Sequence, residues 1–106
     1  MTTPFPTHAR VVIVGGGVIG TSIAYHLAKL GWKDIVLLER DQLTSGTTWH
    51  AAGLIASAGM AGETLLWSEQ YTRKLYENLE AETGLSTGFK AIGHLHVASN
   101  ATRRET

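Results

Sequence analysis

The sequence predicts an α/β fold in which a βαβ unit carries a partial parallel sheet. Two apolar runs of four residues, Val11–Val14 and Ile35–Leu38, have the length and composition of buried parallel strands. Between them, about residues 17–30 show helical periodicity, and Gly31 follows as a suitable C-terminal glycine. Parallel strands need a crossover connection of this kind, so the order strand, helix, strand predicts a βαβ unit.

A Gly-x-Gly-x-x-Gly sequence joins the first strand to the helix at Gly15, Gly17 and Gly20. The first glycine allows a tight turn out of the strand, the second lets a pyrophosphate approach the backbone, and the third lets the helix pack closely on the strand. Free N–H groups and the helix dipole favour phosphate at the helix start. The pattern therefore predicts a Rossmann-like dinucleotide-binding unit. The alternative is a phosphate-free βαβ unit with a chance glycine turn, which the flanking strands and helix disfavour.

Glu39 follows the second predicted strand, nineteen residues after Gly20. A carboxylate at about this offset hydrogen-bonds the ribose hydroxyls of a dinucleotide and repels a 2′-phosphate, so NADP is disfavoured. The acid alone does not separate FAD from NAD. The structural alternative is a solvated acid at the end of a strand.

The composition excludes several classes of function. The 106 residues carry nine basic and nine acidic side chains and no cysteine, so disulfides and thiolate metal sites are absent. No basic stripe indicates nucleic acid, and no apolar run is long enough to span a membrane. Residues 1–9 read as a loose lead-in without the features of a targeting peptide, and residues 10–106 as the domain. We expect a cytoplasmic location, with neither nucleic acid nor membrane as partner.

The remainder of the chain predicts a second long helix and a further strand. Residues 41–62 read as a long loop with room for one helical turn, and Glu63–Thr83 as a helix ended by Gly84. Residues 89–98 alternate like a strand that presents His94 and His96 on one face. Two histidines without a third ligand do not make a convincing metal site, and we expect none.

The loop 44–54 is the second candidate for a functional role. Its glycines and small hydroxyl residues suit close approach to a flat cofactor and its phosphates. His50 lies among them. From the residues alone it is a satisfied structural histidine, a base, a hydrogen-bond donor or a nucleophile, and the choice stays open.

These motifs together resemble the N-terminus of the FAD-dependent amine oxidoreductases of the D-amino-acid-oxidase and glycine-oxidase superfamily. Within it, the dimethylglycine and sarcosine dehydrogenase branch is the most similar. The most specific of the matching stretches is the loop from Ser45 to Leu54. The matching stretches are residues 12–20, 24–28, 36–40, 45–54, 75–84 and 93–98.

The resemblance implies FAD as cofactor and assigns the residues that bind it. The three motif glycines, with Val18 and Ile19, would hold the pyrophosphate, and Glu39 the ribose, with Arg40 beside it. His50 matches the histidine that these dehydrogenases bond to the 8α carbon of the flavin, which would make the flavin covalent. The residues implied on the flavin side are Gly46, Thr47, Thr48, Trp49, His50, Ala51, Ala52, Gly53 and Leu54.

The implied reaction is the oxidation of N-methyl amines or amino acids by hydride transfer to the flavin. We identify no catalytic residue in this chain, because the substrate-holding residues of this family belong to a later domain. We therefore expect a truncated N-terminal portion, completed by a further domain or subunit, with a partner flavoprotein or oxygen as electron acceptor. Two alternatives stay open, namely a non-catalytic nucleotide-binding fragment or subunit and an NAD-dependent Rossmann enzyme. Because exposed sheet edges and apolar faces would remain, we expect the isolated chain to be marginally stable or prone to aggregate.

Overall fold

The computed structural model describes residues 4–56, 62–95 and 97–100 of the protein. The chain divides into two units, Met1–Leu54 and Ile55–Thr106, which are considered separately below. The expected boundary between a lead-in and a domain at residues 9 and 10 stays a prediction.

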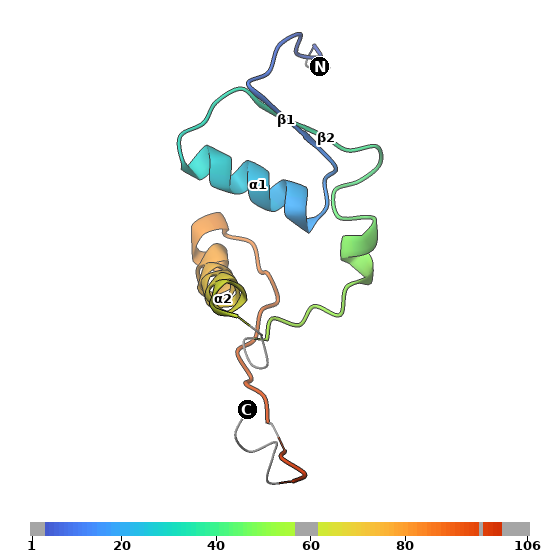
Figure 1. The fold of residues 1–106 in the computed structure, drawn as a ribbon. Coiled ribbons are helices and arrows are strands. Elements are labelled where there is room, and N and C mark those ends of the chain that lie inside the picture. The colour runs from blue at the N-terminus through green and yellow to red at the C-terminus, as the bar shows by residue number, and fades with distance from the viewer. Residues whose placement is uncertain (1–3, 57–61, 96, 101–106) are drawn as a thin grey trace. The chain divides into compact units, whose positions relative to one another are not determined.

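The first unit is the predicted βαβ unit (Figure 1). Strands β1 (Val11–Val14) and β2 (Ile35–Leu38) pair in parallel, with Val11 opposite Ile35 and Val14 opposite Leu38. Helix α1 (Val18–Lys29) connects them, and a single 3₁₀ turn, η1 (Thr47–His50), lies in the following loop. Both strands, the crossover helix and the helical turn in the loop were predicted, and the structure confirms them.

Gly31 ends helix α1 in the manner expected from the sequence. It adopts a positive φ of 84°, and its N–H donates to the Ala28 carbonyl at 2.9 Å. The Trp32 N–H donates to the Leu27 carbonyl at 3.0 Å. These two bonds form a Schellman motif, which satisfies carbonyls at the helix end and turns the chain toward β2.

Close packing of α1 on β1 depends on Gly20, which is buried. A Cβ atom at this position would collide with the backbone carbonyl oxygen of Gly15 and lie 3.3 Å from Cγ2 of Ile13. The packed face of the helix continues through Ala24 and Leu27, which are half-buried. Three larger apolar side chains of the helix are exposed, because the small residues already lie against the sheet: Ile19, Ile23 and Leu30.

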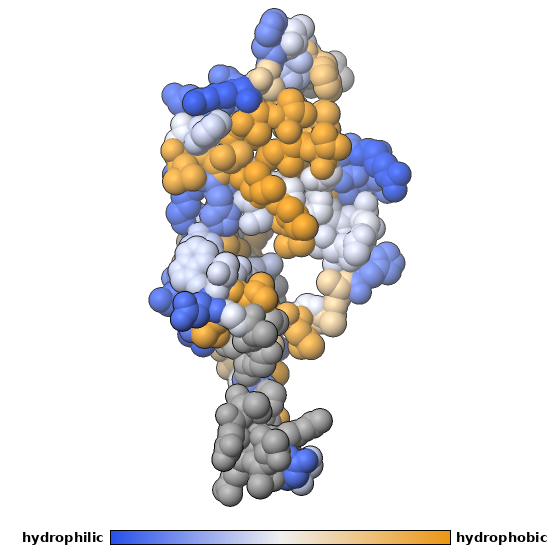
Figure 2. Space-filling model, viewed as in Figure 1, coloured by the Kyte–Doolittle hydropathy of each residue, from blue (hydrophilic) through white to orange (hydrophobic). Residues whose placement is uncertain are grey.

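The core of this unit is small. Among the described residues, Ile13 is the only buried hydrophobic side chain, with 7% of its surface exposed. The prediction that both strands are fully buried is wrong for this chain. Val12 and Val14 are 54% and 83% exposed, because a single helix covers only one face of a two-stranded sheet. Figure 2 shows the resulting hydrophobic surface over the region of β1 and β2. The expectation of uncovered apolar faces is thereby confirmed.

The second unit contains helix α2 (Glu63–Thr83), which has the predicted bounds. Gly84 ends it in the left-handed conformation with a φ of 73°. Arg73 pairs with Glu77 at 3.7 Å on the exposed side, and the ring of Tyr76 lies 6.1 Å from that of Phe89. Among the described residues, no helix has the length and apolar character of a membrane span.

The strand expected at residues 89–98 is not formed in the part of this segment that the structure describes. Residues 89–95 and 97–98 have no strand pairing, and the only sheet among the described residues is the pair β1 and β2. An alternating sequence becomes a strand only when a neighbouring strand accepts its hydrogen bonds, and this segment has no such neighbour. His96 lies outside the described residues, so the geometry of the His94 and His96 pair is not defined.

The packing of α1 predicts the effect of a single methyl group. Gly20→Ala should lower the free energy of unfolding of the first unit by about 1–3 kcal/mol. The new Cβ would collide with backbone atoms, which cannot move aside as a flexible side chain can. Urea unfolding followed by far-ultraviolet circular dichroism measures this loss. Ala28→Ser on the exposed side of α1 is the control and should shift stability by less than about 0.7 kcal/mol. Equal midpoints for the two variants would contradict the packing argument.

Candidate functional site

The glycine turn between β1 and α1 forms one wall of the candidate site. Gly15 has a φ of 103°, a conformation that residues with a Cβ rarely adopt, and its N–H extends the β-ladder to the Leu38 carbonyl at 2.8 Å. Gly17 is the N-cap of α1 and has no side chain with which to cap it. The structure thus confirms the expected turn at Gly15 and the close packing at Gly20.

Glu39 ties the end of β2 to this turn. Its Oε2 accepts the N–H of Gly16 at 2.7 Å, and its Oε1 accepts the N–H of Asp41 at 3.0 Å. The first of these bonds, followed by the second, lowers the pKa of Glu39 below its ordinary value of 4.5. Glu39 is therefore ionised at neutral pH and holds a fixed negative charge at the edge of the glycine turn.

The loop after β2 returns to the same turn through two further hydrogen bonds. The Thr44 N–H donates to the Gly16 carbonyl at 2.9 Å. The Val18 N–H, at the start of α1, donates to Oγ1 of Thr48 at 2.9 Å. The loop is therefore held on the glycine turn by the protein's own polar groups.

Three N–H groups at the start of α1 remain without a hydrogen-bond partner among the described residues, those of Gly17, Ile19 and Gly20. The first four N–H groups of a helix have no partner within the helix, and they carry the positive end of its dipole. They create a place for an anion at the mouth of the turn.

These elements enclose a cleft of about 740 Å³, within the range of small-molecule sites. Its walls come from β1, the glycine turn, α1, the end of β2 and the loop that includes η1. The lining residues are Ile13, Val14, Gly15, Gly17, Val18, Ile19, Gly20, Ile23, Glu39, Arg40, Asp41, Thr44, Ser45, Gly46, Thr47, Thr48 and Ala51.

Most of the residues expected to bind a cofactor line this cleft, but five of them do not: Trp49, His50, Ala52, Gly53 and Leu54. Trp49 and Leu54 are 78% and 85% exposed. Sequence reasoning missed the lining residues Ile13, Val14, Ile23 and Asp41. Thr44 and Ser45, which also line the cleft, belong to the loop 44–54 that was expected to approach a cofactor.

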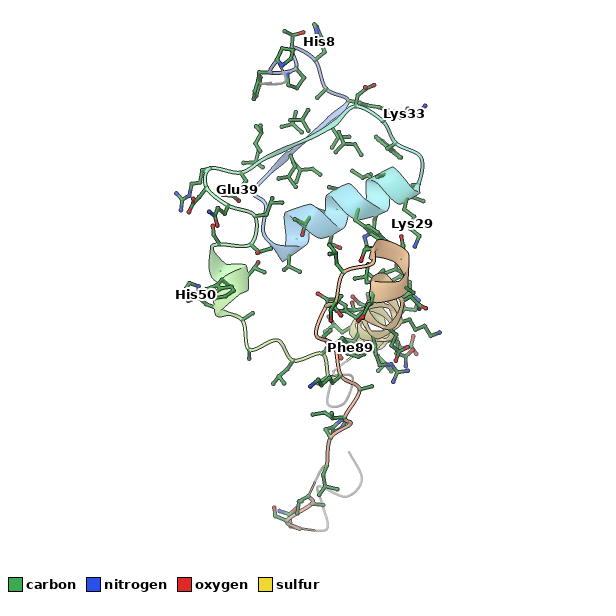
Figure 3. The ribbon with its side chains drawn as sticks, turned by 180° about the vertical axis from the view of Figure 1, so that it is seen from behind. His8, Lys29, Lys33, Glu39, His50 and Phe89 are labelled. Carbon is green, nitrogen blue, oxygen red and sulfur yellow. The ribbon has the colours of Figure 1, made fainter. Side chains whose placement is uncertain are left out.

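His50 lies at the end of η1, with its ring directed away from α1 (Figure 3). Its Nδ1 lies 3.0 Å from the Gly46 carbonyl oxygen. A carbonyl only accepts hydrogen bonds, so Nδ1 must carry the proton. In the neutral imidazole, Nε2 then has the free lone pair.

Comparison with known proteins identifies the family. The sequence profile of the DAO family, described as FAD dependent oxidoreductase, matches residues 10–106. The chain belongs to this family. FAD is the cofactor on which the family depends, and the unpartnered N–H groups and the fixed acid of the cleft suit a dinucleotide. The match favours FAD over the NAD-dependent alternative.

Over the aligned segment, named relatives are identical to the chain at nearly half of the positions. Human dimethylglycine dehydrogenase, mitochondrial, is 48% identical over 95% of this chain, and 4-methylaminobutanoate oxidase (formaldehyde-forming) of Paenarthrobacter nicotinovorans is 48% identical over 94%. The pyruvate dehydrogenase phosphatase regulatory subunit, mitochondrial, of Mus musculus is 45% identical over 92%. The chain spans only 11–12% of the length of these relatives. Two of their names place those proteins in mitochondria, whereas a cytoplasmic location for this chain stays a prediction.

The lowered pKa of Glu39 predicts a pH-dependent contribution to stability. A folded-state pKa below 4.5 means that the ionised side chain stabilises the fold above this pH, and that the contribution is lost as the pH falls through the lowered value. Glu39→Gln should therefore be less stable than the parent at neutral pH, and the difference should vanish in acid. Urea midpoints across this range measure it.

Glu77→Gln is the matched control, because Glu77 is an exposed acid whose Arg73 pair lies on the surface of α2. Its stability should follow that of the parent at every pH. A Glu39→Gln difference that persists unchanged into acid would show that ionisation of Glu39 is not its source.

Proposed function

We propose that the chain is the FAD-binding portion of a flavin-dependent oxidoreductase that oxidises N-methyl amines or amino acids by hydride transfer to the flavin. The observation that carries this proposal is the cleft, in which a glycine turn, unpartnered helix N–H groups and an ionised Glu39 meet. Membership of an FAD-dependent family supports the assignment of that cleft to FAD.

The pyrophosphate of FAD belongs at the start of α1. The N–H groups of Gly17, Ile19 and Gly20 are available to donate to phosphate oxygens, and all three residues line the cleft. The helix dipole adds a favourable interaction of about 0.3–1 kcal/mol with a negative group there. Gly17 brings no side chain between the ligand and the backbone.

Glu39 binds the adenosine ribose while it continues to hold the turn. An ionised carboxylate has about four acceptor positions, and the Gly16 and Asp41 N–H groups use two of them. The other two accept the 2′- and 3′-hydroxyls, and the charge repels a 2′-phosphate. Arg40, next to it, also lines the cleft.

The flavin side of the site lies along the loop after β2. Gly46, Thr47, Thr48 and Ala51 line the cleft there, and their small side chains leave room for a flat ring system. Once bound, FAD supplies the acceptor for a hydride from the carbon next to the amine nitrogen. The contribution of this chain is to bind and orient the cofactor, because none of its residues is assigned to the substrate.

His50 is the proposed site of covalent attachment. The hydrogen bond from Nδ1 to the Gly46 carbonyl leaves Nε2 as the nitrogen with a free lone pair, so Nε2 is the atom that would bond to the 8α carbon. The new bond would replace a C–H bond of the 8α methyl group; the proton would leave to solvent, and the flavin would take up the two electrons and pass them to oxygen or the partner flavoprotein. His50 is exposed and does not line the cleft. Attachment therefore requires the flavin to extend past the lining residues toward the outer side of η1.

The names of the relatives support the substrate class. 4-Methylaminobutanoate and dimethylglycine are both methylated amines, and their two enzymes resemble this chain to the same extent. A further domain or subunit would supply the substrate-binding residues. The electron acceptor would be oxygen or a partner flavoprotein.

A second candidate function is a non-catalytic, nucleotide-binding subunit or fragment. One specific observation favours it, since the mouse relative is named as a regulatory subunit and not as an oxidase or dehydrogenase. Turnover distinguishes the two functions. Oxidation of dimethylglycine or sarcosine by the protein with bound FAD supports the enzyme, whereas FAD binding without turnover supports the second candidate.

The proposal predicts selectivity between dinucleotides. The purified chain should bind FAD saturably and bind NADH at least about tenfold more weakly, corresponding to about 1.4 kcal/mol. Isothermal titration calorimetry with each ligand measures both affinities. Tighter binding of NADH than of FAD would overturn the assignment of the cofactor.

The geometry of His50 predicts where a covalent bond forms. The intact mass of the protein from its native source, measured under denaturing conditions, should include one flavin, and peptide mapping should place it on His50. His50→Ala should bind FAD without retaining it on denaturation. His8→Ala, which changes an exposed histidine in the lead-in, is the control and should retain the covalent flavin. A bare mass for the parent would refute covalent attachment without affecting reversible FAD binding.

A further inference from the structure

We propose that Thr48 is a positioning residue whose hydroxyl fixes η1 on the N-terminus of α1 and so organises the FAD cleft before the cofactor binds. This inference rests on the proposed function, because it concerns the same cleft. Thr48 acts through a backbone N–H group of the helix and through the turn that it belongs to.

The start of α1 requires a cap that its own sequence does not supply. The N-cap residue is Gly17, and no side chain within the helix caps it. Serine and threonine are favoured caps because their oxygen accepts an N–H of the first turn. Here that oxygen is Oγ1 of Thr48, thirty residues further along the chain, which accepts the Val18 N–H at 2.9 Å.

Gly17 and Thr48 fit together sterically. A Cβ atom at position 17 would lie only 3.0 Å from Oγ1 of Thr48, closer than most such contacts. The absence of a side chain at Gly17 therefore leaves room for the Thr48 hydroxyl as well as for a phosphate. This is a second reason for glycine at this position, and it comes from the fold of the protein itself.

The Thr48 bond determines which N–H groups are available to FAD. With the Val18 N–H occupied, those of Gly17, Ile19 and Gly20 remain for the pyrophosphate. The expectation that Val18 takes part in holding the pyrophosphate stays a prediction, and in this proposal its N–H group holds the loop. The assignment gives each donor at the helix start one partner.

The same bond sets the position of the turn that carries His50. Within η1, the Trp49 N–H donates to the Gly46 carbonyl at 3.1 Å, and Nδ1 of His50 lies 3.0 Å from the same oxygen. Thr48 links this small hydrogen-bonded turn to α1. Loss of its hydroxyl should therefore affect both the pyrophosphate end and the His50 end of the site.

Three variants test the role of the hydroxyl. Thr48→Val removes it with almost no change in shape, and Thr48→Ser retains it. Thr64→Val is the matched control, because Thr64 lies exposed on α2 and its hydroxyl has no partner among the described residues. Helical content from circular dichroism shows whether each variant is folded.

The first measurement uses the chain without FAD. Amide hydrogen exchange of Val18, followed by NMR, should be slow in the parent, in Thr48→Ser and in Thr64→Val, and about tenfold faster in Thr48→Val. Equal exchange in the parent and in Thr48→Val would overturn the proposal. So would an unprotected Val18 amide in the parent, which decides the question even if Thr48→Val fails to fold.

The second measurement is the affinity for FAD. Thr48→Val should bind about tenfold more weakly than the parent, while Thr48→Ser and Thr64→Val should stay within about threefold of it. Equal or tighter binding by Thr48→Val would mean that the hydroxyl merely competes with phosphate, which overturns the proposed role. If the parent itself fails to bind FAD, the proposed function fails, and the Val18 exchange still decides whether Thr48 organises the cleft.

Discussion

The contact between the third motif glycine and the first is the constraint on which the rest of the site depends. Because Gly20 has no Cβ, α1 lies directly against the carbonyl of Gly15. Any other residue would push the helix from the strand and move its N-terminal N–H groups with it. The cleft is therefore determined by backbone packing first and by polar side chains second, which is why a small core around Ile13 is enough to define it.

Two side chains from elsewhere in the chain accept hydrogen bonds from backbone N–H groups of the glycine turn and the helix start. Glu39 accepts the Gly16 N–H and Thr48 accepts the Val18 N–H, while three further N–H groups of the helix start have no partner in the part of the chain that the structure describes. Each bond joins segments that are distant in sequence, so the glycine turn, the end of β2 and the loop form one network. The hydrogen bonds by which Glu39 holds the turn also lower its pKa, and the resulting charge would select the ribose in the proposed function.

Local patterns made much of this fold predictable from the sequence. The strands, both helices and their terminal glycines follow from short-range rules, and the structure places them within a residue or so of the predicted positions. The bond between Thr48 and Val18 could not be predicted, because it depends on how a long loop returns to the helix. Solvent exposure of the strands and the missing strand at residues 89–98 were mispredicted for a related reason. Apolar and alternating patterns report what a segment can bury or pair with, not whether a partner is available.

The chemistry of the cleft is compatible with the different names of the relatives that match this segment. The hydrogen-bond donors of the cleft are largely backbone N–H groups. Apart from its glycines, the cleft therefore depends on few particular residues, namely one acid and one residue with a hydroxyl group. Under the proposed function these groups bind the cofactor and do not select the substrate, which is compatible with relatives named as an oxidase, a dehydrogenase and a regulatory subunit. Under the proposed covalent attachment, His50, whose Nδ1 is held at the Gly46 carbonyl, is the residue of this segment that would act directly on the flavin.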